Sequence, residues 1–205
     1  DLLYSYEEAA LLLSRRFFCN QGQHVLGYEE LPSMQADFPA LDKTRVEYYC
    51  KTLVDYLQTF NRRKVAELLS ILEDKLHLVE TDSEEVKLFM ADLYLRVKEE
   101  MTRKYTSVEI PFASNQKAIS YINEQRYLYE IISYFSEQCE QVIAAIGNSS
   151  RDSVLDDILY YIEHNYPSNL KLEGIAALFG YNSSYLGKIF NKSVGESFNS
   201  YVDQV

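Results

Sequence analysis

The chain has 205 residues, 47% of them hydrophobic, which is enough for one large domain or two small ones with a buried core. Glycine (7) and proline (4) are scarce, which favours a mainly helical protein. The formal net charge of -11 excludes a protein that coats nucleic acid through an overall basic surface. No apolar run is long enough to cross a membrane. Three widely spaced cysteines predict free thiols in a reducing, cytoplasmic compartment.

The first predicted unit covers residues 1–31, as a helix followed by a strand. Ser5, with Glu8 three residues later, is typical of a capping box at a helix start. The run from His24 to Tyr28 predicts a short strand. Because a single strand is not stable alone, we expect a helix-strand remnant of a preceding segment, with its sheet partners outside this sequence.

A helical region is predicted over residues 42–147. Within residues 42–104, apolar residues recur at steps of three and four, which predicts three amphipathic helices. Thr81 and Glu84 predict the start of the third helix. A further stripe with heptad spacing fits either packing inside a helical bundle or a helix that pairs two copies of the chain. It comprises Leu128, Ile132, Phe135, Cys139, Val142 and Ile146.

A different unit is predicted over residues 152–205, after a linker at residues 147–150. Its apolar spacing predicts three short helices, with Gly180 in the turn before the third and Asn182 or Ser183 as that helix's cap. Two short helices joined by a tight glycine turn form a helix-turn-helix. The predicted fold class is therefore mainly α: a helical bundle followed by a helix-turn-helix unit.

The outward face of the last of these helices is a candidate DNA-binding surface. Its hydroxyl, amide and ammonium groups are those that base edges and phosphates accept. Residues 180–192 contain two lysines and no acid, in a chain with 31 acidic residues. Lys188 is the best single candidate, although the spacing alone also fits an ordinary solvent-facing helix. The candidate residues are Ser183, Ser184, Gly187, Lys188, Asn191 and Lys192.

The run from Leu170 to Tyr201 resembles the first helix-turn-helix of bacterial AraC/XylS-family transcription regulators. The matching residues are Leu172-Glu173, Ile175-Ala176, Gly180-Tyr181, Tyr185-Leu186, Phe190-Asn191-Lys192, Gly195 and Phe198 to Tyr201. The family has two such units joined by a long helix, so the resemblance implies that residues 197–205 begin this helix and that the second unit lies outside the sequence. It also implies base reading from Ser184, Gly187 and Lys188, of which Gly187 has no side chain to offer.

The N-terminal part resembles a degenerate GGDEF-like segment in the runs Ser5 to Ala9, Arg16 to Phe18 and Val25 to Tyr28. Such segments occur in response regulators that begin with a phospho-receiver domain and end in an AraC-type domain. The resemblance implies a two-component system in which a sensor kinase acts on a receiver domain absent from this sequence. It implies promoter DNA and a second copy, in a homodimer, as the partners of the intact protein.

Enzyme chemistry is not indicated. The histidines His24, His77 and His164 lie far apart, and no histidine or cysteine pair has metal-ligand spacing. No phosphate-binding glycine loop or nucleophile motif is present. We therefore predict no catalysis, cofactor, metal or membrane association, and a DNA-binding regulator whose upstream helices relay a signal or dimerise. The alternative is a helical signalling or protein-interaction module without direct DNA readout.

Overall fold

The computed structural model describes residues 2–27, 41–78, 82–106, 108–147, 154–165 and 170–204. This part of the chain is mainly helical and holds no strand, which confirms the predicted fold class. The helices are α1 (Leu2–Ser14), the short 3-10 helix η1 (Arg15–Phe18), α2 (Lys43–Gln58), α3 (Arg62–His77), α4 (Ser83–Lys104), α5 (Asn115–Glu124), α6 (Leu128–Gly147), α7 (Val154–Asn165), α8 (Leu172–Phe179), α9 (Ser183–Val194) and α10 (Phe198–Val202).

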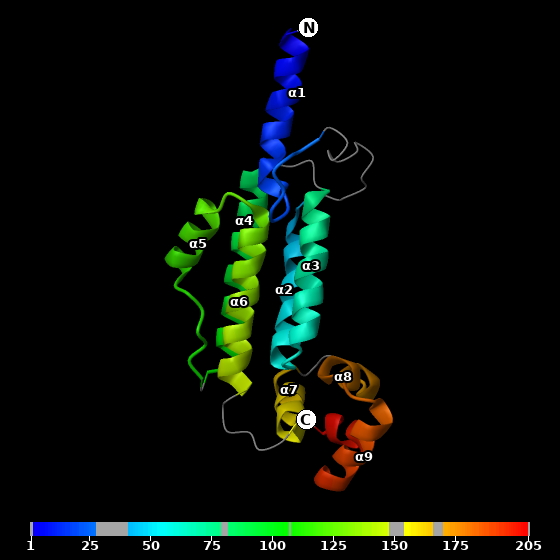
Figure 1. Cartoon of the computed structure of the whole chain (residues 1–205). Helices are drawn as coiled ribbons and strands as arrows, with labels where there is room; N and C mark the ends of the chain where they lie inside the picture. Colours follow the sequence, from blue (N-terminus) through cyan, green and yellow to red (C-terminus); the bar gives the residue numbers. More distant parts are fainter. Residues whose placement is uncertain are drawn as a thin grey trace.

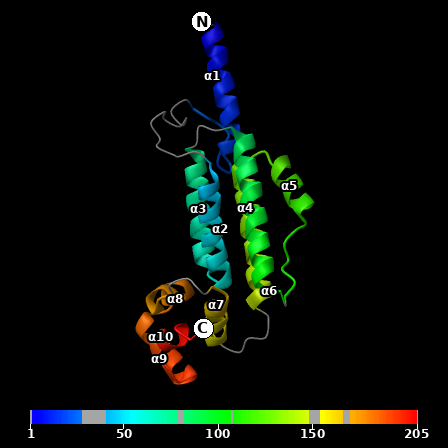
Figure 2. The same cartoon turned by 180° about the vertical axis from the view of Figure 1, so that it is seen from behind.

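Four long helices, α2, α3, α4 and α6, lie side by side and form the bundle, with α5 on its outer side (Figures 1 and 2). The three helices predicted within residues 42–104 are confirmed as α2, α3 and α4. Their apolar stripes face inward: Leu57, Leu76 and Leu93 are all 0% exposed. The cysteines Cys19, Cys50 and Cys139 are free, as predicted, and all three are buried.

The heptad stripe of α6 is part of the bundle core. No member of the stripe is more than 8% exposed, because α2 and α3 pack against this helix. Packing inside a bundle is therefore confirmed for this stripe. Dimerisation through it is wrong, because side chains covered by the chain's own helices are not available to a second copy.

The N-terminal region differs from its prediction in two ways. Helix α1 begins at Leu2, so Ser5 lies inside the helix and does not cap it. Residues 24–27 form no strand, while Tyr28 lies outside the described residues. Among the described residues no strand is available to accept ladder hydrogen bonds, and the Gln23 side chain bonds locally to Asn20 N and Val25 O. The predicted helix-strand remnant is therefore helix and coil in its described part.

The start of α4 is capped one residue later than predicted. The Asp82 side chain accepts a hydrogen bond from Glu85 N at 2.9 Å, whereas Thr81 lies outside the described residues. Asp82 has the extended backbone of an N-cap residue, and its carboxylate satisfies an amide that has no partner within the helix. The helix itself starts where the apolar periodicity predicts.

Helices α7 to α10 form the C-terminal unit (residues 154–204) around an apolar core of their own. Ile158, Ile162, Ile175 and Phe190 are at most 1% exposed and belong to a cluster separate from the bundle core. Of the predicted linker at residues 147–150, Gly147 is the last residue of α6 and the rest lies outside the described part, so the boundary between the two regions stays a prediction. The two cores nevertheless give each region its own source of stability.

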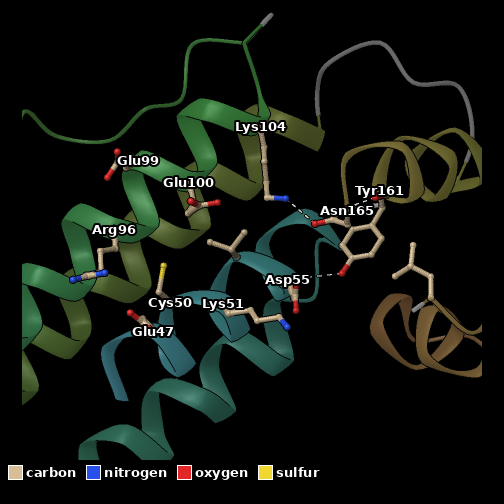
Figure 3. A pocket seen from close by; sticks show the side chains of 12 residues that line it. Glu47, Cys50, Lys51, Asp55, Arg96, Glu99, Glu100, Lys104, Tyr161 and Asn165 are labelled. Atoms are coloured by element: carbon tan, nitrogen blue, oxygen red, sulfur yellow. Dashed lines mark hydrogen bonds between the residues drawn. The ribbon is translucent and has the colours of Figure 1, made fainter. Parts of the chain in front are cut away.

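Polar contacts hold the C-terminal unit against one end of the bundle (Figure 3). The Tyr161 hydroxyl donates to Asp55 Oδ1 at 3.1 Å, and Lys104 Nζ donates to Asn165 Oδ1 at 2.7 Å. The Tyr160 hydroxyl donates to the Lys104 carbonyl oxygen at 2.6 Å. We call this set of contacts the junction. It joins α2 and α4 of the bundle to α7, the first helix of the C-terminal unit.

A second contact joins the turn between α2 and α3 to α8. Asn61 Nδ2 donates to the Leu178 carbonyl oxygen at 3.1 Å, while Asn61 Oδ1 accepts from Lys64 N at 3.2 Å. One amide side chain therefore caps α3 and contacts the C-terminal unit. The preceding residue, Phe60, has a left-handed backbone (φ 54°), which lets the chain turn sharply enough to present Asn61 at this end of the bundle.

The junction makes stability depend on pH through Asp55. Burial raises the pKa of this carboxyl above its ordinary value of 3.8, although the Tyr161 hydrogen bond and Lys51 oppose the shift. The folded protein thus holds the proton more tightly than the unfolded chain, so stability falls as pH rises from 3.8 through the raised pKa.

Asp55→Asn keeps an acceptor for Tyr161 but has no proton to lose. The unfolding free energy of this variant minus that of the wild type is expected to grow across the same pH window and then to level off. Urea unfolding at a series of pH values measures this difference. A difference that stays constant with pH would contradict the assignment to Asp55.

Candidate nucleic-acid interface

A tight turn sets α8 against α9. Helix α8 ends at Gly180, whose left-handed backbone (φ 74°) is readily adopted only by glycine. Tyr181 N then donates to the Ala176 carbonyl oxygen at 2.7 Å, which closes the end of the helix. Asn182 caps α9, as predicted, because its side chain accepts from Ser184 N and Tyr185 N at 2.9 and 3.3 Å. The two helices and their turn have the form of a helix-turn-helix.

Gly187 faces α8. A β-carbon at this position would lie 3.1 Å from Leu172 Cδ2, closer than side chains normally pack. The absence of a side chain therefore allows α8 and α9 to approach each other. Among the predicted site residues, Gly187 thus serves the packing of the two helices and offers no group to a base.

The other predicted residues form an exposed face on α9. Ser184, Lys188, Asn191 and Lys192 are exposed, whereas Ser183 is half-buried. The four exposed residues lie opposite Leu186 and Phe190, which enter the core, whereas Ser183 lies on the side of Phe190. Within the described part of the chain, neither lysine takes part in an ion pair. Figures 1 and 2 place α9 at the end of the molecule farthest from α1, beyond α7 and α8.

Two tyrosines beside this face were not among the predicted site residues. The rings of Tyr181 and Tyr185 stack with centroids 6.2 Å apart, and they are 37% and 54% exposed. Tyr185 lies seven residues before Lys192, on the same side of α9. A phenol hydroxyl can donate to a phosphate oxygen. The sequence feature that could have revealed them is a pair of tyrosines four residues apart in a segment without acidic residues. Their exposure, however, depends on the turn at Gly180.

The described residues were also compared with the requirements of a metal site, a histidine cluster and a membrane span. No group of three histidine, cysteine or acidic side chains there could hold a metal ion. The histidines are dispersed: His77 Nδ1 lies 2.8 Å from the Glu73 carbonyl oxygen, and the ring of His164 stacks on Tyr160. None of the described helices is both long and apolar enough for a membrane span.

Similarity to a known regulator covers part of the chain. Over 68 residues, which are 33% of the chain, it is 34% identical to the uncharacterized HTH-type transcriptional regulator YtdP of Bacillus subtilis (strain 168). The matched segment spans only 9% of YtdP. No protein-family model matches the chain, and no solved structure matches it significantly. A segment that makes up 33% of the chain is thus similar to part of a transcriptional regulator of the helix-turn-helix type.

Proposed function

We propose that the chain is part of a DNA-binding transcription regulator of the AraC/XylS type, in which α9 reads promoter DNA in the major groove. The exposed face of α9 carries this proposal: Ser184, Lys188 and Asn191 point away from the core on the second helix of a helix-turn-helix. In such pairs the second helix enters the groove and presents its outward side chains to base edges and phosphates. The similarity to YtdP supports the same function class.

The bundle is proposed to control this reader. Its end contacts both α7, through Asp55 and Lys104, and α8, through Asn61. A shift in the bundle therefore changes the surroundings of the helices that support α9. In the intact cytoplasmic protein, a receiver domain modified by a sensor kinase is proposed to supply this shift. The homodimer proposed for DNA binding uses a surface other than the buried stripe of α6.

We expect residues 1–205 alone to bind DNA weakly or undetectably. Residues 151–205 carry four basic and seven acidic side chains, and one short helix with two lysines makes few phosphate contacts. The intact protein, with a second helix-turn-helix, is expected to bind its promoter specifically. Gel shifts of both proteins at low salt, with promoter DNA and a scrambled duplex, measure the difference.

Each outcome of these gel shifts bears on a different part of the proposal. Tight, specific binding by residues 1–205 would contradict the need for a second reading unit. An intact protein that does not distinguish promoter from scrambled DNA would contradict DNA reading by α9. That second result would favour the alternative function, a helical signalling or interaction module.

A further inference from the structure

Two tyrosines of the C-terminal unit carry hydroxyls that bond to nothing in the described part of the chain. Tyr181 and Tyr185 are 37% and 54% exposed, and neither hydroxyl makes a hydrogen bond to another described residue. The other described tyrosines of this unit all use their hydroxyls as donors, namely Tyr160, Tyr161 and Tyr201. The two unsatisfied donors therefore lie close together, one in the turn before α9 and one in its first turn.

The turn restricts where these two hydroxyls lie. The rings of Tyr181 and Tyr185 stack at an interplanar angle of 26°, with centroids 6.2 Å apart. The backbone of Tyr181 is held by its hydrogen bond to the Ala176 carbonyl oxygen, and that of Tyr185 by the Asn182 cap. A contact made by side chains that are already in place loses little conformational entropy on binding.

Tyr185 lies on the edge of α9 that faces away from α8. A helix turns by about 100° per residue, so Tyr185 and Lys192 lie within about 20° of each other around its axis. Gly187, which faces α8, lies about 160° from Tyr185. A helix of about 10–12 Å diameter fills a major groove about 12 Å wide, so its outward middle meets the bases and its edges meet the sugar-phosphate strands. Tyr185 and Lys192 are therefore placed to border one strand.

The charge of this edge suits a phosphate. Residues 174–195 contain no acidic side chain, although the chain has 31. Lys192 is exposed and forms no ion pair with another described residue. The oxygens of a phosphate diester accept hydrogen bonds, and phenol and ammonium groups donate them. A DNA strand thus offers the partners that these donors lack.

We propose that Tyr181 and Tyr185 bind the sugar-phosphate backbone of the DNA strand that borders this edge of α9, with Lys192 contacting the same strand. The two hydroxyls donate to phosphate oxygens, and the stacked rings keep the donors together. Such contacts set the placement of α9 in the groove and carry no sequence information. This role rests on the proposed reading of DNA by α9, and it makes the two tyrosines positioning residues of that helix.

Tyr185→Phe in the intact protein tests this role, because it removes the hydroxyl and keeps the ring. Fluorescence anisotropy over a salt series, with a promoter duplex and a scrambled duplex of equal length, measures the effect. The affinity for both duplexes is expected to fall about fivefold, since one neutral hydrogen bond is lost. The ratio of the two affinities is expected to stay constant, because a phosphate contact does not distinguish sequences. The salt slope should also stay constant, because an uncharged group releases no counterion.

Three further variants complete the comparison. Tyr181→Phe is expected to lower the affinity in the same way as Tyr185→Phe. Lys192→Ala removes a charge from the same edge and is expected to make the slope of log K against log salt shallower by about one. Tyr48→Phe is the matched control, because Tyr48 is 60% exposed on α2 of the bundle, and its affinity should equal that of the wild type.

An affinity that stays unchanged in both Tyr181→Phe and Tyr185→Phe would overturn the proposal. A loss confined to the promoter duplex would do the same, since it would indicate base reading, as would an equal loss in Tyr48→Phe. These outcomes leave the reading of DNA by α9 intact. A wild-type protein that does not distinguish promoter from scrambled duplex contradicts that reading itself, and the role of the tyrosines with it, so the two failures are distinguishable.

Discussion

Phe190→Ala is expected to lower the unfolding free energy of the C-terminal unit by about 3–5 kcal/mol. Phe190 is 0% exposed, and its ring packs edge-on against Phe198 and Tyr201 with both centroid distances at 5.5 Å. These contacts join α9 to α10 in the core of the C-terminal unit. The truncation leaves a cavity that the surrounding side chains refill only in part.

The loss is expected to stay within the C-terminal unit, because its core is separate from that of the bundle. Hydrogen exchange measured by segment tests this: protection falls in α7 to α10 and persists in α2, α3, α4 and α6. Tyr185→Ala on the same helix is the matched control, since its ring is 54% exposed. It should change stability by no more than about 0.5 kcal/mol. Equal loss of protection in both regions would show that they unfold as one unit.

Lys188→Ala in the intact protein is expected to weaken promoter binding about tenfold at low salt. Lys188 is exposed on the outward face of α9 and has no ion-pair partner among the described residues. A lysine that contacts a phosphate releases about one counterion, so the slope of log K against log salt should also become shallower by about one. Fluorescence anisotropy over a salt series measures both effects.

Lys117→Ala is the control for overall charge, because Lys117 is an exposed residue of α5, on the outer side of the bundle. It removes the same positive charge from a chain whose net charge is already -11. Its affinity and salt slope should match those of the wild type. If both alanine variants weaken binding equally, the effect comes from net charge and α9 is not the reading helix.

The sequence was most informative where apolar spacing and turn chemistry agreed. Helix α3 follows from the regular steps of Val65, Leu69, Leu72 and Leu76, which are all buried. Gly180 and Asn182 likewise specify the end of α8 and the start of α9 through local backbone requirements alone. Features that depend on three or four neighbouring residues could therefore be placed before the fold was known.

Features that depend on distant partners were not predictable. The run from His24 to Tyr28 has the composition of a strand, but the described part of the chain holds no strand with which residues 24–27 could pair. The α6 stripe fits a bundle and a coiled coil equally well, and only the packing of α2 and α3 against it distinguishes them. The cavity beside the junction is lined by residues of α2, α4 and α7, so no local pattern could reveal it.

The double role of Asn61 separates the capping of α3 from the contact with α8. Its oxygen caps α3 and its nitrogen holds the Leu178 carbonyl, so the two hydrogen bonds use opposite ends of one amide. When α8 moves away, the nitrogen bond is exchanged for water while the cap on Lys64 N persists. Loss of this one contact therefore frays no helix, whereas the junction hydrogen bonds of Asp55 and Lys104 to α7 are separate from it. The cap at the start of α3 is thus independent of the contact with α8, so the stability of this helix does not depend on where the C-terminal unit lies.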